Sequence, residues 1–218
     1  DFDPHVERTR SRPLASGEMT VRDALLAFIT LMLQAFGLVL MTNTLTVKLA
    51  FAGAVLASSY PFFKRWTHFP QVVLGVAFGW GIPMAFAAET GQVASAAWWI
   101  LLINVIWSVI YDTLYAMVDR DDDISIGLKS TAIFFGKSDL LILRILKVLM
   151  IALLVWLGIN LQFSWPWFAG VAVAAVLFAR QQYQVRNRDR DACFKAFLNN
   201  NWVGVAIWVG LLMTYFVG

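Results

Sequence analysis

Long apolar runs alternate with short polar connections along most of the chain. Seven of these runs have about the length that a helix needs to cross a membrane, roughly twenty residues. They cover Val21–Asn43, Leu45–Phe63, Gln71–Ala88, Ala96–Val118, Leu140–Asn160, Trp165–Tyr183 and Asn199–Gly218. No linker or low-complexity segment interrupts them. The pattern therefore predicts one all-α domain over residues 1–218, a polytopic membrane bundle with seven transmembrane helices.

The third run contains glycine and proline residues that affect how its helix packs and bends. Gly75 and Gly79 are four residues apart, a spacing that lets transmembrane helices approach each other closely. Pro83 removes a backbone donor, and we expect it to kink the same helix. The interpretation for all three residues is packing rather than chemistry.

The connections between the runs differ in charge. One set is long or charged and consists of residues 1–20, 64–70, 119–139 and 184–198. The other set is short and almost uncharged, and it lies around Thr44, Thr90–Ser95 and Leu161–Ser164. Of seventeen Lys and Arg residues, fourteen lie in the first set or at its helix edges. Because positive charge favours the cytoplasmic side, we expect the first set in the cytoplasm and the C-terminus outside.

Composition supports the membrane interpretation and narrows the chemistry. The chain is 60% hydrophobic and 14% charged, whereas about a quarter of a soluble domain is charged. The single cysteine, Cys193, excludes a disulfide framework and any metal site built from several cysteines. Since membrane orientation explains the basic segments, we expect a lipid bilayer as partner and no nucleic acid.

An acidic segment, YDTLYAMVDRDDD, lies at the foot of the fourth run. Asp112, Asp119 and Asp123 are spaced by seven and four residues, which on one α-helix places them on a stripe with Tyr115. The neighbouring carboxylates of Asp119 and Asp123 repel each other unless a cation lies between them. Carboxylates at a membrane surface suit Mg²⁺ and, through it, a diphosphate. We therefore expect Asp119 and Asp123 to bind metal.

Other acidic and imidazole side chains have simpler interpretations. Asp121 and Asp122 fit a solvated loop. Asp112 lies two turns deeper than Asp119 and is also compatible with a buried carboxylate bonded to a neighbouring helix. His5 and His68 are far apart in the sequence and fit surface positions better than a shared site.

Basic side chains flank the acidic stripe in the expected topology. Taken singly, each is explained by membrane orientation or by contact with lipid headgroups. Taken together with a carboxylate-bound Mg²⁺, they are suited to bind a diphosphate and to stabilise it as a leaving group. These cations are Arg8, Arg12, Lys64, Arg65 and Lys129.

Four segments carry a resemblance to a known family: YDTLYAMVDRDDD with IGLKSTA, YPFFKRWTHFPQ, FGWGIPMAFAA and HVERTRSRPLASG. The chain resembles the intramembrane aromatic prenyltransferases over essentially its whole length. Within them it is most similar to the 4-hydroxybenzoate polyprenyltransferases of bacterial ubiquinone synthesis. The acidic segment with its Lys-Ser sequel is the most specific part of the match.

The resemblance implies nine helices around a central cavity, in a bacterial inner-membrane protein with two Asp-rich motifs on cytoplasmic loops. The second motif maps to Asp119 and Asp123, preceded by Asp112 and Tyr115. The first, Asn-Asp-x-x-Asp-x-x-x-Asp, is represented only by its last carboxylate, Asp3. Matching residues follow as Arg8, Thr9, Arg12 and Pro13. We therefore expect an N-terminally truncated copy that lacks the first two helices.

The implied reaction is electrophilic prenylation of an aromatic ring. Asp3, Asp119 and Asp123 would bind Mg²⁺ on the diphosphate of a polyprenyl donor, with Asp112 and Tyr115 as further catalytic residues. The residues expected to stabilise the leaving diphosphate are Lys129, Arg8 and Arg12. Arg65 is the candidate for the carboxylate of 4-hydroxybenzoate, because a guanidinium can bind it through two parallel hydrogen bonds; a diphosphate or lipid contact is the alternative.

Rival functions differ in the residues that they require. An ion or proton pathway favours acidic groups near the bilayer midplane, whereas only Arg144 and Lys147 are charges well inside an expected span. A phosphoalcohol transferase would need an Asp-Gly-x-x-Ala-Arg string, which the sequence lacks. A prenyltransferase with another aromatic acceptor, such as a naphthoate or homogentisate, is the nearest alternative.

Overall fold

The computed structural model describes residues 11–217, apart from the side chain of Lys64, and the regular structure within that range is entirely helical. The all-α prediction is therefore confirmed. The helices are α1 (Val21–Leu40), α2 (Thr44–Trp66), α3 (Pro70–Gly79), α4 (Gly81–Thr90), α5 (Ser95–Val118), α6 (Arg120–Ser125), α7 (Thr131–Phe135), α8 (Asp139–Asn160), α9 (Trp165–Gln184), α10 (Arg190–Leu198) and α11 (Asn200–Val217). A short 3₁₀ turn, η2 (Gly136–Ser138), joins α7 to α8.

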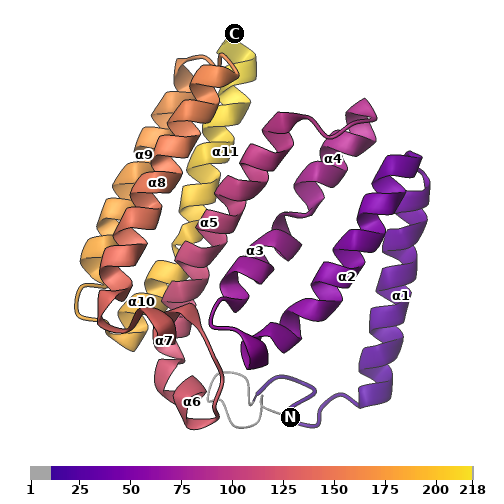
Figure 1. Ribbon diagram of the computed structural model, residues 1–218, viewed down its shortest axis with the longest axis vertical. Coiled ribbons are helices and arrows are strands. Elements are labelled where there is room, and N and C mark those ends of the chain that lie inside the picture. The colour runs from indigo at the N-terminus through magenta and orange to yellow at the C-terminus, as the bar shows by residue number, and fades with distance from the viewer. Residues whose placement is uncertain (1–10, 218) are drawn as a thin grey trace.

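The long helices run up and down side by side, with α1 at one side of the molecule and α8 and α9 at the other (Figure 1). The short helices α6, α7 and α10 all lie at one end, where the described part of the N-terminal segment also lies. We call this the basic end, defined by residues 11–22, 65–69, 119–139 and 185–199. The nearly uncharged connections lie at the opposite end (Figure 1), so the predicted alternation of the connections is confirmed.

Six segments of the described chain are long and apolar enough to cross a membrane. They contain α1, α2, the pair α3–α4, α5, α8 and α11, and they correspond to six of the seven predicted spans. The seventh predicted span is α9, a helix of 20 residues that runs beside α8 and α11 (Figure 1). The chain is a multi-pass membrane protein.

The third span is not one kinked helix, as the sequence suggested, but two helices that meet at Trp80. Pro83 explains the position of the break, because it has no N–H to donate to the carbonyl of Gly79. The two predicted small residues do allow close packing. A Cβ on Gly75 would lie 2.9 Å from the Cα of Val105 on α5, and Asn104 of α5 donates a hydrogen bond to the Gly75 carbonyl.

Helix α5 forms the centre of the core, since it packs against α3, α8 and α10. Its residues Ile110 and Leu114 are fully buried, and Leu143 of α8 and Val203 of α11 join them in one cluster. Helix α1, in contrast, has no buried residue and contacts α2. The many exposed large apolar side chains of the outer helices are those expected of surfaces that face lipid.

Candidate active site

The acidic segment forms a helical turn that follows the central helix. Helix α5 ends at Val118, and the backbone of Asp119 departs from helical geometry before α6 begins. The predicted single stripe of carboxylates is therefore interrupted at Asp119. Asp119 and Asp123 nevertheless stay one turn apart, because the Asp123 amide donates to the Asp119 carbonyl at 2.8 Å.

Burial separates the four aspartates of this turn into two pairs. Asp119 and Asp123 are only 6% and 3% exposed. The side chain of Asp121 is 80% exposed, and those of Asp121 and Asp122 lie 3.2 and 3.9 Å from the guanidinium of Arg190. The two carboxylates predicted to bind metal are thus the two that the fold withdraws from water. The solvated interpretation of Asp121 fits its exposure and its ion pair.

Lys129 reaches the segment that carries Arg65. Gly127 turns the chain after α6 with a φ of +72°, a conformation that glycine adopts without strain. Two residues later, Lys129 donates a hydrogen bond of 3.3 Å to the carbonyl of Trp66, at the end of α2. The contact joins two segments that are 63 residues apart in the sequence.

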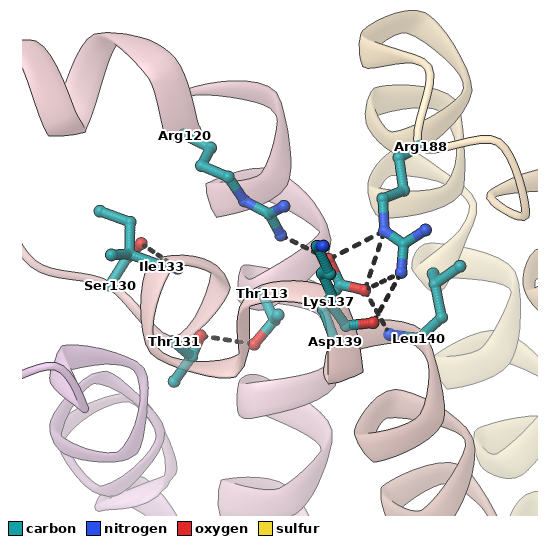
Figure 2. Close-up of polar contacts among 9 residues, drawn as sticks. All are labelled: Thr113, Arg120, Ser130, Thr131, Ile133, Lys137, Asp139, Leu140 and Arg188. Atoms are coloured by element: carbon teal, nitrogen blue, oxygen red, sulfur yellow. Dashed lines mark hydrogen bonds and ion pairs between the residues drawn. The ribbon is translucent and has the colours of Figure 1, made fainter.

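Buried polar contacts fix the loop that carries Lys129 (Figure 2). Ser130 caps α7 by accepting from the Ile133 amide. The hydroxyl of Thr131 lies 2.6 Å from that of Thr113 on α5, and both residues are fully buried (Figure 2). The Thr131 amide donates to the side chain of Gln71 on α3 at 3.2 Å. Sequence reasoning missed these anchors, because small hydroxyl residues carry no positional signal of their own.

The two predicted catalytic residues of α5 lie deeper than the acidic turn. Asp112 and Tyr115 are half-buried, and the ring of Tyr115 packs edge-on against Phe197 of α10 with centroids 5.1 Å apart. Tyr60 of α2 lies close enough to both to interact with them electrostatically. Tyr60 was not predicted, since no pattern in the sequence connects it to α5.

The structure describes only some of the remaining cations that were predicted to lie at the site. Arg65 and Arg12 are exposed at the basic end. Asp3 and Arg8 lie outside the described residues, as does the side chain of Lys64. Arg12, Arg65 and Lys129 thus lie at the same end of the bundle as the acidic turn, which is the end that the predicted topology assigned to them.

Another aspartate at the basic end has a structural role. Asp139, whose side chain is fully buried, lies between the guanidinium groups of Arg120 and Arg188 (Figure 2). Arg188 also donates to the Lys137 carbonyl, and its hydrogen bonds to Asp139 raise the pKa of Arg188 above its usual value. This cluster ties the start of α6 to the start of α8 and to the connection after α9.

The donor set suits Mg²⁺ bound together with a phosphate ligand. Among residues 11–217, no group of three or more His, Cys, Asp and Glu side chains has the geometry of a metal centre. Mg²⁺ in proteins is commonly held by one or two carboxylates, with phosphate oxygens and water as its other ligands. The buried pair of Asp119 and Asp123 provides two such carboxylates on one helical turn.

The sequence matches the family model of the UbiA prenyltransferase family over nearly its whole length, residues 1–211. The chain belongs to the UbiA prenyltransferase family. This confirms the resemblance that the acidic segment indicated.

Curated relatives of this UbiA family member share more than half of its residues. A 4-hydroxybenzoate octaprenyltransferase of Alkalilimnicola ehrlichii is 55% identical over 218 residues, which is 100% of this chain and 74% of the relative. A protein of the same name from Xanthomonas euvesicatoria is 56% identical over 210 residues, 96% of this chain and 70% of the relative.

Solved structures confirm the fold. A UbiA homologue from Aeropyrum pernix superposes with a TM-score of 0.86 at 23% identity, over 98% of this chain and 80% of that one. A UbiA homologue from Archaeoglobus fulgidus, bound to GPP and Mg²⁺, gives a TM-score of 0.63 at 19% identity, over 99% of this chain and 79% of that one. At such identities the likeness concerns the membrane helix bundle alone.

Proposed function

We propose that this UbiA family member transfers a polyprenyl group from polyprenyl diphosphate to 4-hydroxybenzoate, in ubiquinone biosynthesis. The carbon that is prenylated is the ring carbon next to the hydroxyl. The observation that carries the proposal is the buried pair Asp119 and Asp123 at the basic end, beside the anchored loop of Lys129. Relatives more than 50% identical bear the name of this activity.

Asp119 and Asp123 bind Mg²⁺ in this proposal, and the metal supplies charge neutralisation for the diphosphate when it is bound. Burial makes the two carboxylates effective, because water competes little with their charge. Asp3 is a third proposed ligand from the N-terminal segment. Asp112, which lies two helical turns deeper than Asp119, is proposed as a further catalytic carboxylate beside Tyr115.

Lys129, Arg8 and Arg12 stabilise the departing diphosphate as the allylic C–O bond breaks. Lys129 is held by the Trp66 carbonyl and by the anchors of α7, so its ammonium group is oriented before the substrate binds. Arg65 precedes Trp66 on α2 and is proposed to bind the carboxylate of 4-hydroxybenzoate.

The reaction requires that the electrophilic carbon of the donor meets the aromatic ring rather than water. Tyr60 of α2 lies within electrostatic range of Tyr111 and Tyr115 of α5. Their π faces can stabilise a developing cation, and the low water content protects it. The hydroxyl of 4-hydroxybenzoate activates the adjacent ring carbon, which loses its proton after the new C–C bond forms.

The proposal includes a location and an orientation. We propose that the chain lies in the bacterial inner membrane with its basic end in the cytoplasm. The water-soluble acceptor and Mg²⁺ then reach the acidic turn from the cytoplasm, while the polyprenyl tail stays in lipid.

The direct test compares three aspartates of one turn. Membranes that contain the chain with Asp119→Asn or Asp123→Asn should lose about a hundredfold or more of the prenylation of 4-hydroxybenzoate, measured with octaprenyl diphosphate and Mg²⁺. Asp121→Asn is the matched control, and it should stay within about twofold of wild type because its ion pair is exposed. Chelation of Mg²⁺ should abolish the wild-type reaction.

Two outcomes would contradict the proposal. Near-normal turnover of both Asp119→Asn and Asp123→Asn would remove the carboxylates from the mechanism. Turnover of a naphthoate or homogentisate without turnover of 4-hydroxybenzoate would assign another acceptor within the same family.

A further inference from the structure

A cavity of about 620 Å³ lies between α8 and α9, away from the acidic turn. We call it the α8–α9 groove and define it by Arg144, Lys147, Ile151, Phe178, Gln182 and Arg186. Arg144, Lys147 and Ile151 recur on α8 at intervals of three and four. Phe178 and Gln182 of α9 and Arg186, just beyond its end, recur every four residues, so each helix presents one stripe to the groove. Three of the six defining residues are cationic, and nothing in the proposed reaction uses them.

Lys147 is a buried cation held in a fixed position. It is 4% exposed, and its ammonium group donates a hydrogen bond of 3.2 Å to the side chain of Gln182. Gln182 in turn donates to the carbonyl of Leu140, in the first turn of α8, at 2.8 Å. The ammonium group of Lys147 is therefore linked through Gln182 to the first turn of α8, which begins at the basic end.

The other two cations lie at the open side of the groove. Arg144 and Arg186 are exposed, and the guanidinium of Arg186 lies 3.9 Å from the centre of the Tyr183 ring, which holds it over the end of α9. Among residues 11–217, no carboxylate lies within ion-pair distance of Arg144, Lys147 or Arg186. The groove thus has about three positive charges and no internal counter-charge.

The inner part of the groove is apolar. Ile151 and Phe178 line it toward the middle of the bundle, together with the small side chain of Ala175. A ligand that fits both parts has a negatively charged head and a hydrocarbon tail. In a membrane the abundant molecules of this kind are anionic phospholipids, and basic pockets between transmembrane helices are known to bind their headgroups.

We propose that the α8–α9 groove binds one anionic phospholipid. Its phosphate lies among Arg144, Lys147 and Arg186, and one acyl chain lies along Ile151 and Phe178. A membrane-orientation signal alone would need only mobile surface cations. Lys147 is buried and hydrogen-bonded, and a membrane-orientation signal alone does not require either property.

The test uses the chain purified in a neutral detergent, with equal amounts of phosphatidylglycerol and phosphatidylcholine added. Native mass spectrometry measures how much of each lipid the protein retains. Wild type should retain phosphatidylglycerol in preference. The double variant Arg144→Gln with Arg186→Gln should lose roughly thirtyfold of that preference, at about fivefold per cation. Both positions are exposed, so the fold should persist.

The matched control removes two other exposed cations of the basic end, Arg22→Gln with Arg190→Gln, and should bind phosphatidylglycerol like wild type. Equal retention of both lipids by wild type would overturn the proposal. Equal loss in the two double variants would also overturn it, because it would mean that general charge suffices. Displacement of the retained phosphatidylglycerol from wild type by geranyl diphosphate, together with weaker geranyl diphosphate binding to Arg144→Gln with Arg186→Gln, would assign the groove to the prenyl donor instead.

Discussion

Aspartates at the basic end perform different tasks because their neighbours differ. Asp139 is enclosed by two guanidinium groups, and its negative charge is neutralised by Arg120 and Arg188 without any external cation. Asp119 and Asp123 are equally withdrawn from water but share one helical turn, where their mutual repulsion favours a bound divalent ion. The first is a structural tie, and the other two are the proposed metal ligands.

Neutralising Asp139 should lower the stability of the fold, because Asp139 has a structural role and no role in the proposed reaction. Asp139→Asn leaves Arg120 and Arg188 repelling each other at the junction of α6, α8 and the connection after α9, and we expect a loss of about 3 kcal/mol in the free energy of unfolding. Unfolding of the purified chain in detergent, followed by far-UV circular dichroism, measures it. Arg190→Gln, which breaks an exposed ion pair with Asp121, is the control and should cost at most about 1 kcal/mol. Equal losses would refute the structural role of Asp139.

Helices α9 and α11 form the closest helix pair of the bundle. Gly170 of α9 and Gly210 of α11 face each other, with their Cα atoms close enough that a Cβ on Gly170 would lie 3.0 Å from the Gly210 Cα. Such close approach of two backbones is typical of membrane helices. Lipid provides no hydrophobic effect to drive helices together, so they associate by van der Waals packing, which small residues allow. The pairing fixes α10, which connects the two helices and packs below α5.

Filling that contact should separate the two helices. Gly170→Ala would place its Cβ 2.5 Å from the carbonyl of Ala206, so backbone must move, and we expect about 1–3 kcal/mol of destabilisation in the same unfolding assay. Gly37→Ala on α1 is the matched control, because nothing lies within 4 Å of its Cβ. It should be neutral or stabilising, since alanine is the better helix former. A cost for Gly37→Ala as large as that of Gly170→Ala would contradict the packing argument.

Hydropathy predicted the long helices because their physical requirement is local: about twenty apolar residues in succession. Pro83 predicted a kink in the third span, but not that the span would divide into two helices at Trp80. Hydropathy also gave no sign of α6, α7 and α10, which are short and form through tertiary contacts. The spacing of Asp119 and Asp123 was informative because a helical turn preserves it, even across the end of α5.

The interactions that the sequence did not reveal are those between distant segments. The Asp139 cluster joins residues that are 19 and 49 positions apart, and the contact from Lys129 to Trp66 spans 63. Nothing in the order of the residues specifies such pairs without the three-dimensional arrangement of the helices. The sequence shows which charged and polar residues are present, but not which residues they contact.

At the scale of the whole molecule, the two ends of the bundle differ in charge and in structure. The basic end carries α6, α7, α10 and the proposed site, whereas the opposite end consists of tight, nearly uncharged turns (Figure 1). Polar connections of this size are retained on one side of a membrane, and positive charge sets which side that is. Orientation therefore decides from which compartment the acceptor and Mg²⁺ reach the acidic turn.

Thiol accessibility can test this orientation, because the chain has a single cysteine and that residue is buried. With Cys193→Ala as background, Ser16→Cys places a thiol at the basic end and Gln92→Cys places one at the opposite end; both positions are exposed. In spheroplasts, a membrane-impermeant maleimide should label the Gln92→Cys protein at once and the Ser16→Cys protein only after the membrane is permeabilised. The Cys193→Ala background itself is the control and should stay unlabelled. Immediate labelling at Ser16→Cys would place the basic end outside, and the acidic turn would then face the wrong compartment for an acceptor made in the cytoplasm.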